Sequence, residues 1–326
     1  MITFGYVAIF LISCVILHFA SQILIKSLID IGKMLEWKEF VVSFFIMAFA
    51  GSLPNLFLAI VSILNKTPEI SLGDVVGGNV IDLTLAIGLA AIIAPKGITA
   101  ESRTVQSSSI FTLIAAITPL LLLIDGSLSR GDGIIMLVLF FAYIYWLFSK
   151  EERFKKVYDG DKEEQKEKLT IKNGWKVFLK KTGLILLGII LLIGAAEGII
   201  QSSLFFSQKL GTSIALISIL IIGLGNALPE IYFAISSAKK EETWLILGDL
   251  MGAVVIPSSL VLGIVGLASP FFIADFSPFA ISRLFLIISS IFFFIFTRTH
   301  QKITKKEGIV LLSFYVFFVI VQLIFQ

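Results

Sequence analysis

Polar residues inside two otherwise apolar stretches are the strongest candidates for chemistry in this sequence. The stretches "AGSLPN" (50–55) and "GNALPE" (225–230) each place a proline directly before an amide or carboxylate side chain. Proline has no backbone N–H, so a carbonyl about one turn earlier loses its helical partner. Carbonyl, amide and carboxylate oxygens are hard ligands of the kind that Na⁺ and Ca²⁺ require, and Ca²⁺ takes about six to eight of them. The pattern therefore indicates a cation site beside an interrupted helix.

A carboxylate in the middle of an apolar run makes the second stretch the more informative one. Glu230 lies well inside the apolar segment 212–238. Burying an ionised carboxylate within a membrane is costly, and such residues usually mark an ion or substrate pathway. We interpret Glu230 as a cation ligand, and a protonated or amide-bonded structural glutamate is the alternative.

The composition shows which elements must position these residues. Of 326 residues, 57% are hydrophobic and 15% are charged, whereas soluble domains are about half apolar and about a quarter charged. We predict an all-α polytopic membrane protein that has the lipid bilayer as its partner and binds no nucleic acid. Ten apolar blocks are long enough to cross a bilayer as transmembrane helices: about 4–28, 40–64, 70–94, 108–125, 131–149, 183–206, 212–238, 244–268, 277–297 and 308–325. The single Cys14 excludes an intramolecular disulfide and a cysteine metal site.

The chain repeats itself at a fixed offset of 175 residues. "LPNLFLAIVS" (53–62) aligns with "LPEIYFAISS" (228–237), and "LGDVVGGNVIDLTLAIG" (72–88) aligns with "LGDLMGAVVIPSSLVLG" (247–263), without a gap. The two copies lie five spans apart, so the second copy crosses the membrane in the opposite direction. Inverted repeats of this kind build many secondary transporters, whose sites lie near the midplane between the halves.

The repeat divides the chain into two five-helix halves. The first half is 1–149 with the repeat motif 50–88, and the second, inverted half is 183–326 with the motif 225–263. A charged segment, 150–182, joins them. We interpret this segment as a solvated linker, with a regulatory ion sensor or a lipid-binding element as the alternative.

The basic residues predict an orientation in the membrane. Of the 26 Lys and Arg residues, all but Lys66, Arg130, Lys209 and Arg283 fall on one side of the predicted topology. The positive-inside rule assigns that side to the cytoplasm. We expect a cytoplasmic linker 150–182, two external termini and location in a prokaryotic plasma membrane.

At its paired motifs the sequence resembles the calcium/cation antiporter superfamily, whose best-known members are the sodium/calcium exchangers. The matching stretches are "AGSLPN" and "GNALPE" on the first helix of each repeat, then "GDVVGGNVID" (73–82) and "GDLMGAVVIP" (248–257) on the second. The resemblance implies ten helices in two inverted halves. It also implies secondary antiport, most simply of Ca²⁺ against Na⁺ or H⁺, by alternating access at a midplane site between helices 2, 3, 7 and 8. The cations would be substrates, and no cofactor is expected.

The same resemblance implies which residues bind the cation. Position by position, the implied metal ligands are Glu230, Asp82, Asn55, Ser52, Asn226, Gly51 and Asn79. Asn55 stands where the family usually has an acidic residue, and Ala253, Val254 and Pro257 have lost polar groups. The alternative function is therefore a monovalent Na⁺ or K⁺/H⁺ exchanger of the same fold, because Asn55 contributes no charge.

Three further acidic residues are candidates for the ion pathway. Asp74 and Asp249 are equivalent in the two repeats, and they either cap their helices or attract cations, with capping favoured. Glu197 lies along the route or near the outer end of its span. An intramembrane aspartyl protease would use Asp74 and Asp249 as a pair, but "SLGD" and "ILGD" lack a G-x-G-D pattern, and a passive channel is a further alternative. We predict a transporter, not an enzyme.

Overall fold

The protein is almost entirely helical. A computed structural model describes residues 2–34, 52–101, 103–148, 174–241, 243–273 and 277–325. The α-helices are α1 (Ile2–Met34), α3 (Leu53–Leu64), α4 (Glu69–Ile81), α5 (Ile87–Ile93), α6 (Arg103–Leu122), α7 (Arg130–Phe148), α9 (Gly174–Leu210), α10 (Ile214–Ile217), α11 (Gly223–Lys239), α12 (Thr243–Ile256), α13 (Leu262–Ala268), α14 (Ser277–Arg298) and α15 (Lys305–Ile324). Short 3₁₀ turns follow α6 and α14, at η2 (Leu123–Asp125) and η6 (Thr299–Gln301).

The predicted spans correspond to these helices. Within the described ranges, nine helical segments are long and apolar enough to cross a membrane, and α3 is a further, shorter apolar helix. The predicted span 40–64 begins among residues that the structure does not describe, so α3 represents only its second part. The prediction of an all-α polytopic membrane protein is confirmed.

Wide π-helical turns interrupt three of the spans. They are η1 (Asp82–Ala86), η4 (Ser218–Ile222) and η5 (Pro257–Val261). Two of them, η1 and η5, start 175 positions apart, so both copies of the repeat widen at the same place. A π turn shifts backbone hydrogen bonds and is often found at functional sites.

One sequence-based expectation about the helix interruption is wrong in its position. Pro229 was expected to break its helix near Gly225 and Asn226, but α11 continues through Pro229, and the irregular turn η4 ends before Gly223. The missing N–H of proline is tolerated inside the helix because one unpaired carbonyl does not require a break in a packed interior. Pro54, by contrast, lies in the first turn of α3, where no N–H is needed.

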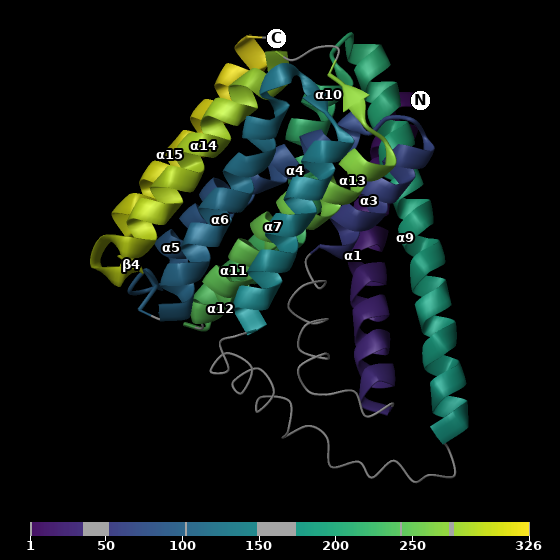
Figure 1. The fold of residues 1–326 in the computed structure, drawn as a ribbon, viewed down its shortest axis with the longest axis horizontal. Helices are drawn as coiled ribbons and strands as arrows, with labels where there is room; N and C mark the ends of the chain where they lie inside the picture. Colours follow the sequence, from purple (N-terminus) through teal and green to yellow (C-terminus); the bar gives the residue numbers. More distant parts are fainter. Residues whose placement is uncertain are drawn as a thin grey trace.

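The two halves exchange their last helices. In Figure 1, α7 runs beside α13, and α15 lies at the other edge of the bundle, where it packs on α5. Glycines allow both contacts: a Cβ on Gly133 would lie 2.8 Å from the Gly263 carbonyl oxygen, and one on Gly308 would lie 2.9 Å from that of Gly88. The four glycines form two pairs related by the 175-residue offset. The last helix of each half therefore packs against a helix of the other half.

Two short β pairs repeat this relationship at the ends of the bundle. β1 (Ile98–Thr99) pairs antiparallel with β4 (Lys302–Ile303), with Ile98 opposite Ile303. β2 (Ser127–Leu128) pairs with β3 (Phe271–Phe272), with Ser127 opposite Phe272. Figure 1 shows the pairs at opposite ends of the molecule, as inversion requires.

The long helices α1 and α9 form a separate pair on one side of the bundle (Figure 1). Their apolar core includes Leu17, Ala20, Leu192 and Ala196 and reaches α3 through Leu58. At one end Lys181 of α9 forms a salt bridge with Asp30 of α1. Helix α9 begins at Gly174 and so extends into the last part of the predicted linker 150–182. Residues 149–173 lie outside the described ranges.

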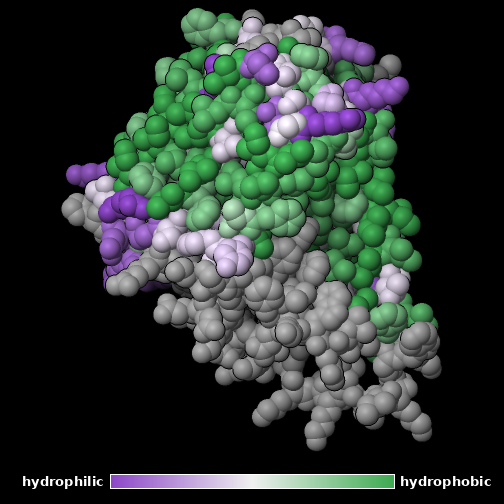
Figure 2. Space-filling model, viewed as in Figure 1, coloured by the Kyte–Doolittle hydropathy of each residue, from purple (hydrophilic) through white to green (hydrophobic). Residues whose placement is uncertain are grey.

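The outer surface agrees with a membrane environment. Figure 2 shows hydrophobic side chains over the middle of this face and hydrophilic residues gathered at its upper rim and lower left. Large exposed apolar side chains line α1, including Phe4, Leu11 and Phe19. Both chain ends lie at the same end of the bundle (Figure 1).

Candidate functional site

A small polar pocket lies between the two copies of the repeat. Its walls come from α3, α4 with η1, α11 and α12. The residues that line it are Asn55, Asp74, Val75, Gly78, Asn79, Asp82, Gly223, Asn226, Ala227, Glu230 and Ala253. Three carboxylates and three amides thus line one cavity.

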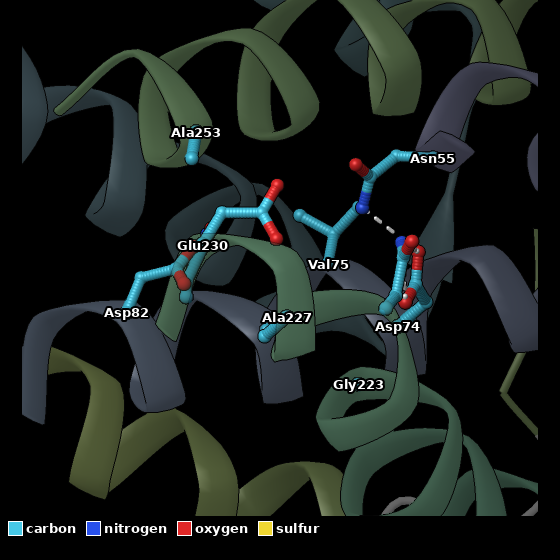
Figure 3. Close-up of a pocket in the computed structure, with 11 residues that line it drawn as sticks. Asn55, Asp74, Val75, Asp82, Gly223, Ala227, Glu230 and Ala253 are labelled. Carbon is cyan, nitrogen blue, oxygen red and sulfur yellow. Dashed lines mark hydrogen bonds between the residues drawn. The ribbon is translucent and has the colours of Figure 1, made fainter. Parts of the chain in front are cut away.

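Asp74 is the acceptor of an amide network at one side of the pocket. Its side chain is 1% exposed. Asn55 Nδ2 donates to Asp74 Oδ2 at 3.0 Å, and Asn226 Nδ2 lies 3.2 Å from both carboxylate oxygens. Figure 3 shows the bond from Asn55 as a dashed line. The network joins α3 and α4 of the first half to α11 of the second.

Asp82 and Glu230 lie on the other side of the pocket (Figure 3). Both are buried, at 4% and 8% exposure. Among the described residues, Asp82 Oδ1 and Glu230 Oε2 have no hydrogen-bond partner, and the two carboxylates interact electrostatically with each other and with Asp74 and Asp249. Buried carboxylate oxygens without partners are costly, and a bound cation would satisfy both.

A further hydrogen bond crosses between the halves at the pocket wall. Asn79 Nδ2 donates to Ser258 Oγ at 2.6 Å, and both side chains are buried. Ser258 belongs to η5, so the bond joins α4 of the first half to the π turn of the second. Because this bond uses the NH₂ group of Asn79, the amide oxygen remains available as an acceptor.

Close backbone contacts explain why α4 and α11 can face each other across so small a space. A Cβ on Gly77 would lie 2.0 Å from the Ile219 carbonyl oxygen, and one on Gly223 would lie 2.9 Å from the Gly78 nitrogen. Gly225 allows another close contact. A Cβ there would lie 2.9 Å from Cys14 Sγ, so glycine lets α1 approach α11 next to Asn226.

The structure brings five of the seven predicted metal ligands into the pocket: Asn55, Asn79, Asp82, Asn226 and Glu230. Ser52 is buried at the start of α3 but does not line it. Gly51 lies outside the described residues. Within the part of the chain that the structure describes, no group of three His, Cys, Asp or Glu side chains could hold a metal ion alone. Any cation here would need the amides as well.

The three predicted pathway residues lie in different places relative to the pocket. Asp74 lines the pocket and lies inside α4, so the favoured capping role is wrong for it. Asp249, its counterpart on α12, is half-buried and does not line the pocket. Glu197 lies away from the pocket, where its carboxylate accepts hydrogen bonds from Asn65 and Gln201 at 2.7 Å each.

Ser258 is the polar residue of this region that the sequence analysis did not single out. Pro257 was taken as the lost counterpart of Asp82, and the hydroxyl one residue later reaches the facing asparagine instead. The signal was present in the sequence as "PSS" at the repeat position, but motif matching by position alone cannot find a residue that is displaced by one.

The fold and the pocket define an integral membrane protein built from two inverted five-helix repeats with a polar site between them. The family model described as sodium/calcium exchanger protein matches residues 5–149 and again residues 180–324. The chain therefore belongs to the sodium/calcium exchanger family, whose members are membrane transporters and not enzymes. The resemblance seen in the motifs is confirmed.

Individual relatives cover nearly the whole chain. The sodium/calcium exchanger MaX1 of Methanosarcina acetivorans is 26% identical and covers 98% of this chain and 99% of its own length. The inner membrane protein YrbG of Escherichia coli is 26% identical over 82% of this chain and 81% of its own. The solved structure of the sodium-calcium exchanger NCX_Mj superposes with a TM-score of 0.60 at 22% identity, covering 97% and 98% of the two chains, and shows the same fold.

Proposed function

We propose that this protein is a secondary antiporter that exchanges Ca²⁺ for Na⁺ or H⁺ at the pocket between α3, α4, α11 and α12. The observation that supports this most directly is a pair of buried carboxylate oxygens, on Asp82 and Glu230, that have no hydrogen-bond partner within the part of the chain that the structure describes. They come from opposite halves of the repeat. If both are ionised, their two negative charges match one divalent cation.

The amides complete the proposed ligand set. Asn55, Asn79 and Asn226 line the same pocket, and amide oxygens are accepted Ca²⁺ ligands. Ser52 and the carbonyl of Gly51 are further proposed ligands on grounds of sequence alone. The relative MaX1 is named a sodium/calcium exchanger, which supports the same cargo.

The position of the pocket supports alternating access as the mechanism. Its ligands are divided between the two halves, so movement of one set of helices against the other would open the pocket to either side of the membrane. The division into halves 1–149 and 183–326, the cytoplasmic linker and the external termini belong to the same proposal. The double match of the family model, at 5–149 and 180–324, supports it.

The test is ⁴⁵Ca²⁺ uptake into Na⁺-loaded proteoliposomes containing wild type, Glu230→Gln or Asp125→Asn. We expect uptake that depends on the Na⁺ gradient in wild type and background uptake in Glu230→Gln, because the amide removes a negative charge from the site. Asp125 is exposed in a loop after α6, so its variant controls for loss of a carboxylate elsewhere.

The competing function is a monovalent Na⁺ or K⁺/H⁺ exchanger, and Asn55 is the observation that favours it. A folded wild-type protein that takes up no Ca²⁺ under any gradient, yet exchanges Na⁺ or K⁺ for H⁺ in the same liposomes, would replace the Ca²⁺ proposal. Driving Ca²⁺ uptake with a proton gradient in the absence of Na⁺ identifies the coupling ion.

A further inference from the structure

Asp74 contacts two of the proposed ligands, Asn55 and Asn226. It is buried, it lies in the middle of α4, and it receives the NH₂ groups of Asn55 and Asn226 at 3.0 and 3.2 Å. When its carboxyl group is ionised, Asp74 can only accept hydrogen bonds. Each amide must therefore turn its nitrogen toward Asp74 and its oxygen away from it. Figure 3 shows the Asn55 oxygen on the side that faces Glu230.

The orientation of these amides decides whether they can bind a cation. An asparagine that presents its NH₂ group to a cation repels it, whereas one that presents its oxygen is a ligand. Without a fixed acceptor behind it, a free amide in a small polar pocket can adopt either orientation. Asp74 removes that freedom for two side chains at once, one from each half of the protein.

Asp74 also places a negative charge close to position 55. Asn55 is neutral, but its amide nitrogen lies 3.0 Å from a carboxylate. The negative charge that an acidic residue would have placed at position 55 is thus supplied by Asp74, which also lines the pocket. Asp249, the counterpart of Asp74, does not line the pocket, and its partner position 230 already carries a glutamate.

Resting on the proposed function, we infer that Asp74 is the positioning residue of this site: it fixes Asn55 and Asn226 with their oxygens toward the cation and supplies the negative charge that Asn55 lacks. The inference concerns this chain's own pair of residues at 55 and 74. It predicts that the two positions can exchange their roles, since an aspartate at 55 needs no orientation and an asparagine at 74 can donate to it.

The experiment compares wild type, Asp74→Asn, Asn55→Asp and the exchange variant Asn55→Asp/Asp74→Asn in the liposome assay. Removing a side chain that orients a metal ligand typically costs about 10- to 100-fold in metal affinity. We expect Asp74→Asn to raise the half-saturating Ca²⁺ concentration by about that factor, with a smaller change in the maximal rate. The exchange variant should recover most of the lost affinity.

Asp249→Asn is the matched control, because it removes the equivalent charge without releasing an amide. Its effect on half-saturation should be smaller, and adding Asn55→Asp should not correct it. Rescue specific to Asp74→Asn cannot arise from a merely structural role. The inference is overturned if Asp74→Asn binds Ca²⁺ like wild type, or if Asn55→Asp improves both aspartate variants equally.

Thermal unfolding of the purified proteins shows whether each variant is folded. Should Asp74→Asn fail to fold, the exchange variant decides alone: half-saturation near the wild-type value supports the inference, and a loss of about tenfold or more, the effect expected of an unpositioned ligand, overturns it. Failure of the proposed function looks different, since wild type itself would then take up no Ca²⁺. In that case the same proteins are compared for half-saturation by Na⁺.

Discussion

At the scale of single residues, Glu197 links α9 to the end of α3 through a hydrogen bond. Its carboxylate accepts one amide N–H from Asn65, which follows α3, and one from Gln201 on its own helix. Replacing it with leucine leaves both amides without this acceptor, and a lost hydrogen bond to a charged group costs about 1.5 to 3 kcal/mol. We expect Glu197→Leu to lower the midpoint of thermal unfolding in detergent.

Glu197→Gln serves as the comparison for this prediction, since it keeps the size and one acceptor oxygen and should destabilise less. The half-saturating cation concentration should be unchanged in both variants, because Glu197 does not line the pocket. A higher half-saturating cation concentration in Glu197→Leu, with an unchanged unfolding midpoint, would instead indicate that Glu197 lies along the ion pathway.

At the scale of elements, the packing of α4 on η4 depends on Gly77. The Cβ of an alanine there would lie 2.0 Å from the Ile219 carbonyl oxygen, which belongs to backbone and cannot simply rotate away. Overpacking of this kind typically costs about 1 to 3 kcal/mol. We expect Gly77→Ala to lower the unfolding midpoint and, by moving η4 away from α4, to impair transport.

The substitution Gly194→Ala in α9 is a control that should not lower stability. A Cβ there meets nothing within 4 Å, and alanine is favoured over glycine in a helix by up to about 1 kcal/mol. Gly194→Ala should therefore be as stable as wild type or more so. Equal destabilisation in both variants would show that the close approach at Gly77 is not what holds these elements together.

The sequence was sufficient to predict elements that have a periodic or repeated signal. The 175-residue offset predicted two equivalent halves, and the positions of η1 and η5 follow it. The π turns themselves could not be predicted, because a shift from one helical hydrogen bond to the next leaves no composition signature. Likewise, Pro229 suggested a break that tertiary packing does not require.

The site was predictable in part for the same reason. Asn55, Asp82 and Glu230 stand at motif positions, and the structure places them in one pocket. The role of Asp74 was not predictable, because it depends on a contact with Asn226, 152 positions away. A residue that orients others is defined by three-dimensional contacts and not by its own motif.

At the scale of the whole molecule, the remaining prediction concerns the orientation in the membrane. The distribution of basic residues predicts that the linker lies in the cytoplasm and that Lys66 lies on the external side. Cys14 is the only cysteine, so a Cys14→Ala background permits single-cysteine labelling. An impermeant maleimide should label Lys66→Cys in intact cells and Lys162→Cys only after the cells are opened. The reverse pattern would invert the topology.

The exchange of last helices has a consequence for synthesis. α7 is complete once residue 148 has entered the membrane, but its packing partner α13 begins only at Leu262. At translation rates of about 5 to 20 residues per second, α7 waits on the order of 10 s beside lipid before its partner exists. During that interval its glycine-lined seam, which includes Gly133, is open to neighbouring nascent chains. The first half is thus inserted into the membrane well before its last helix, α7, can pack against α13.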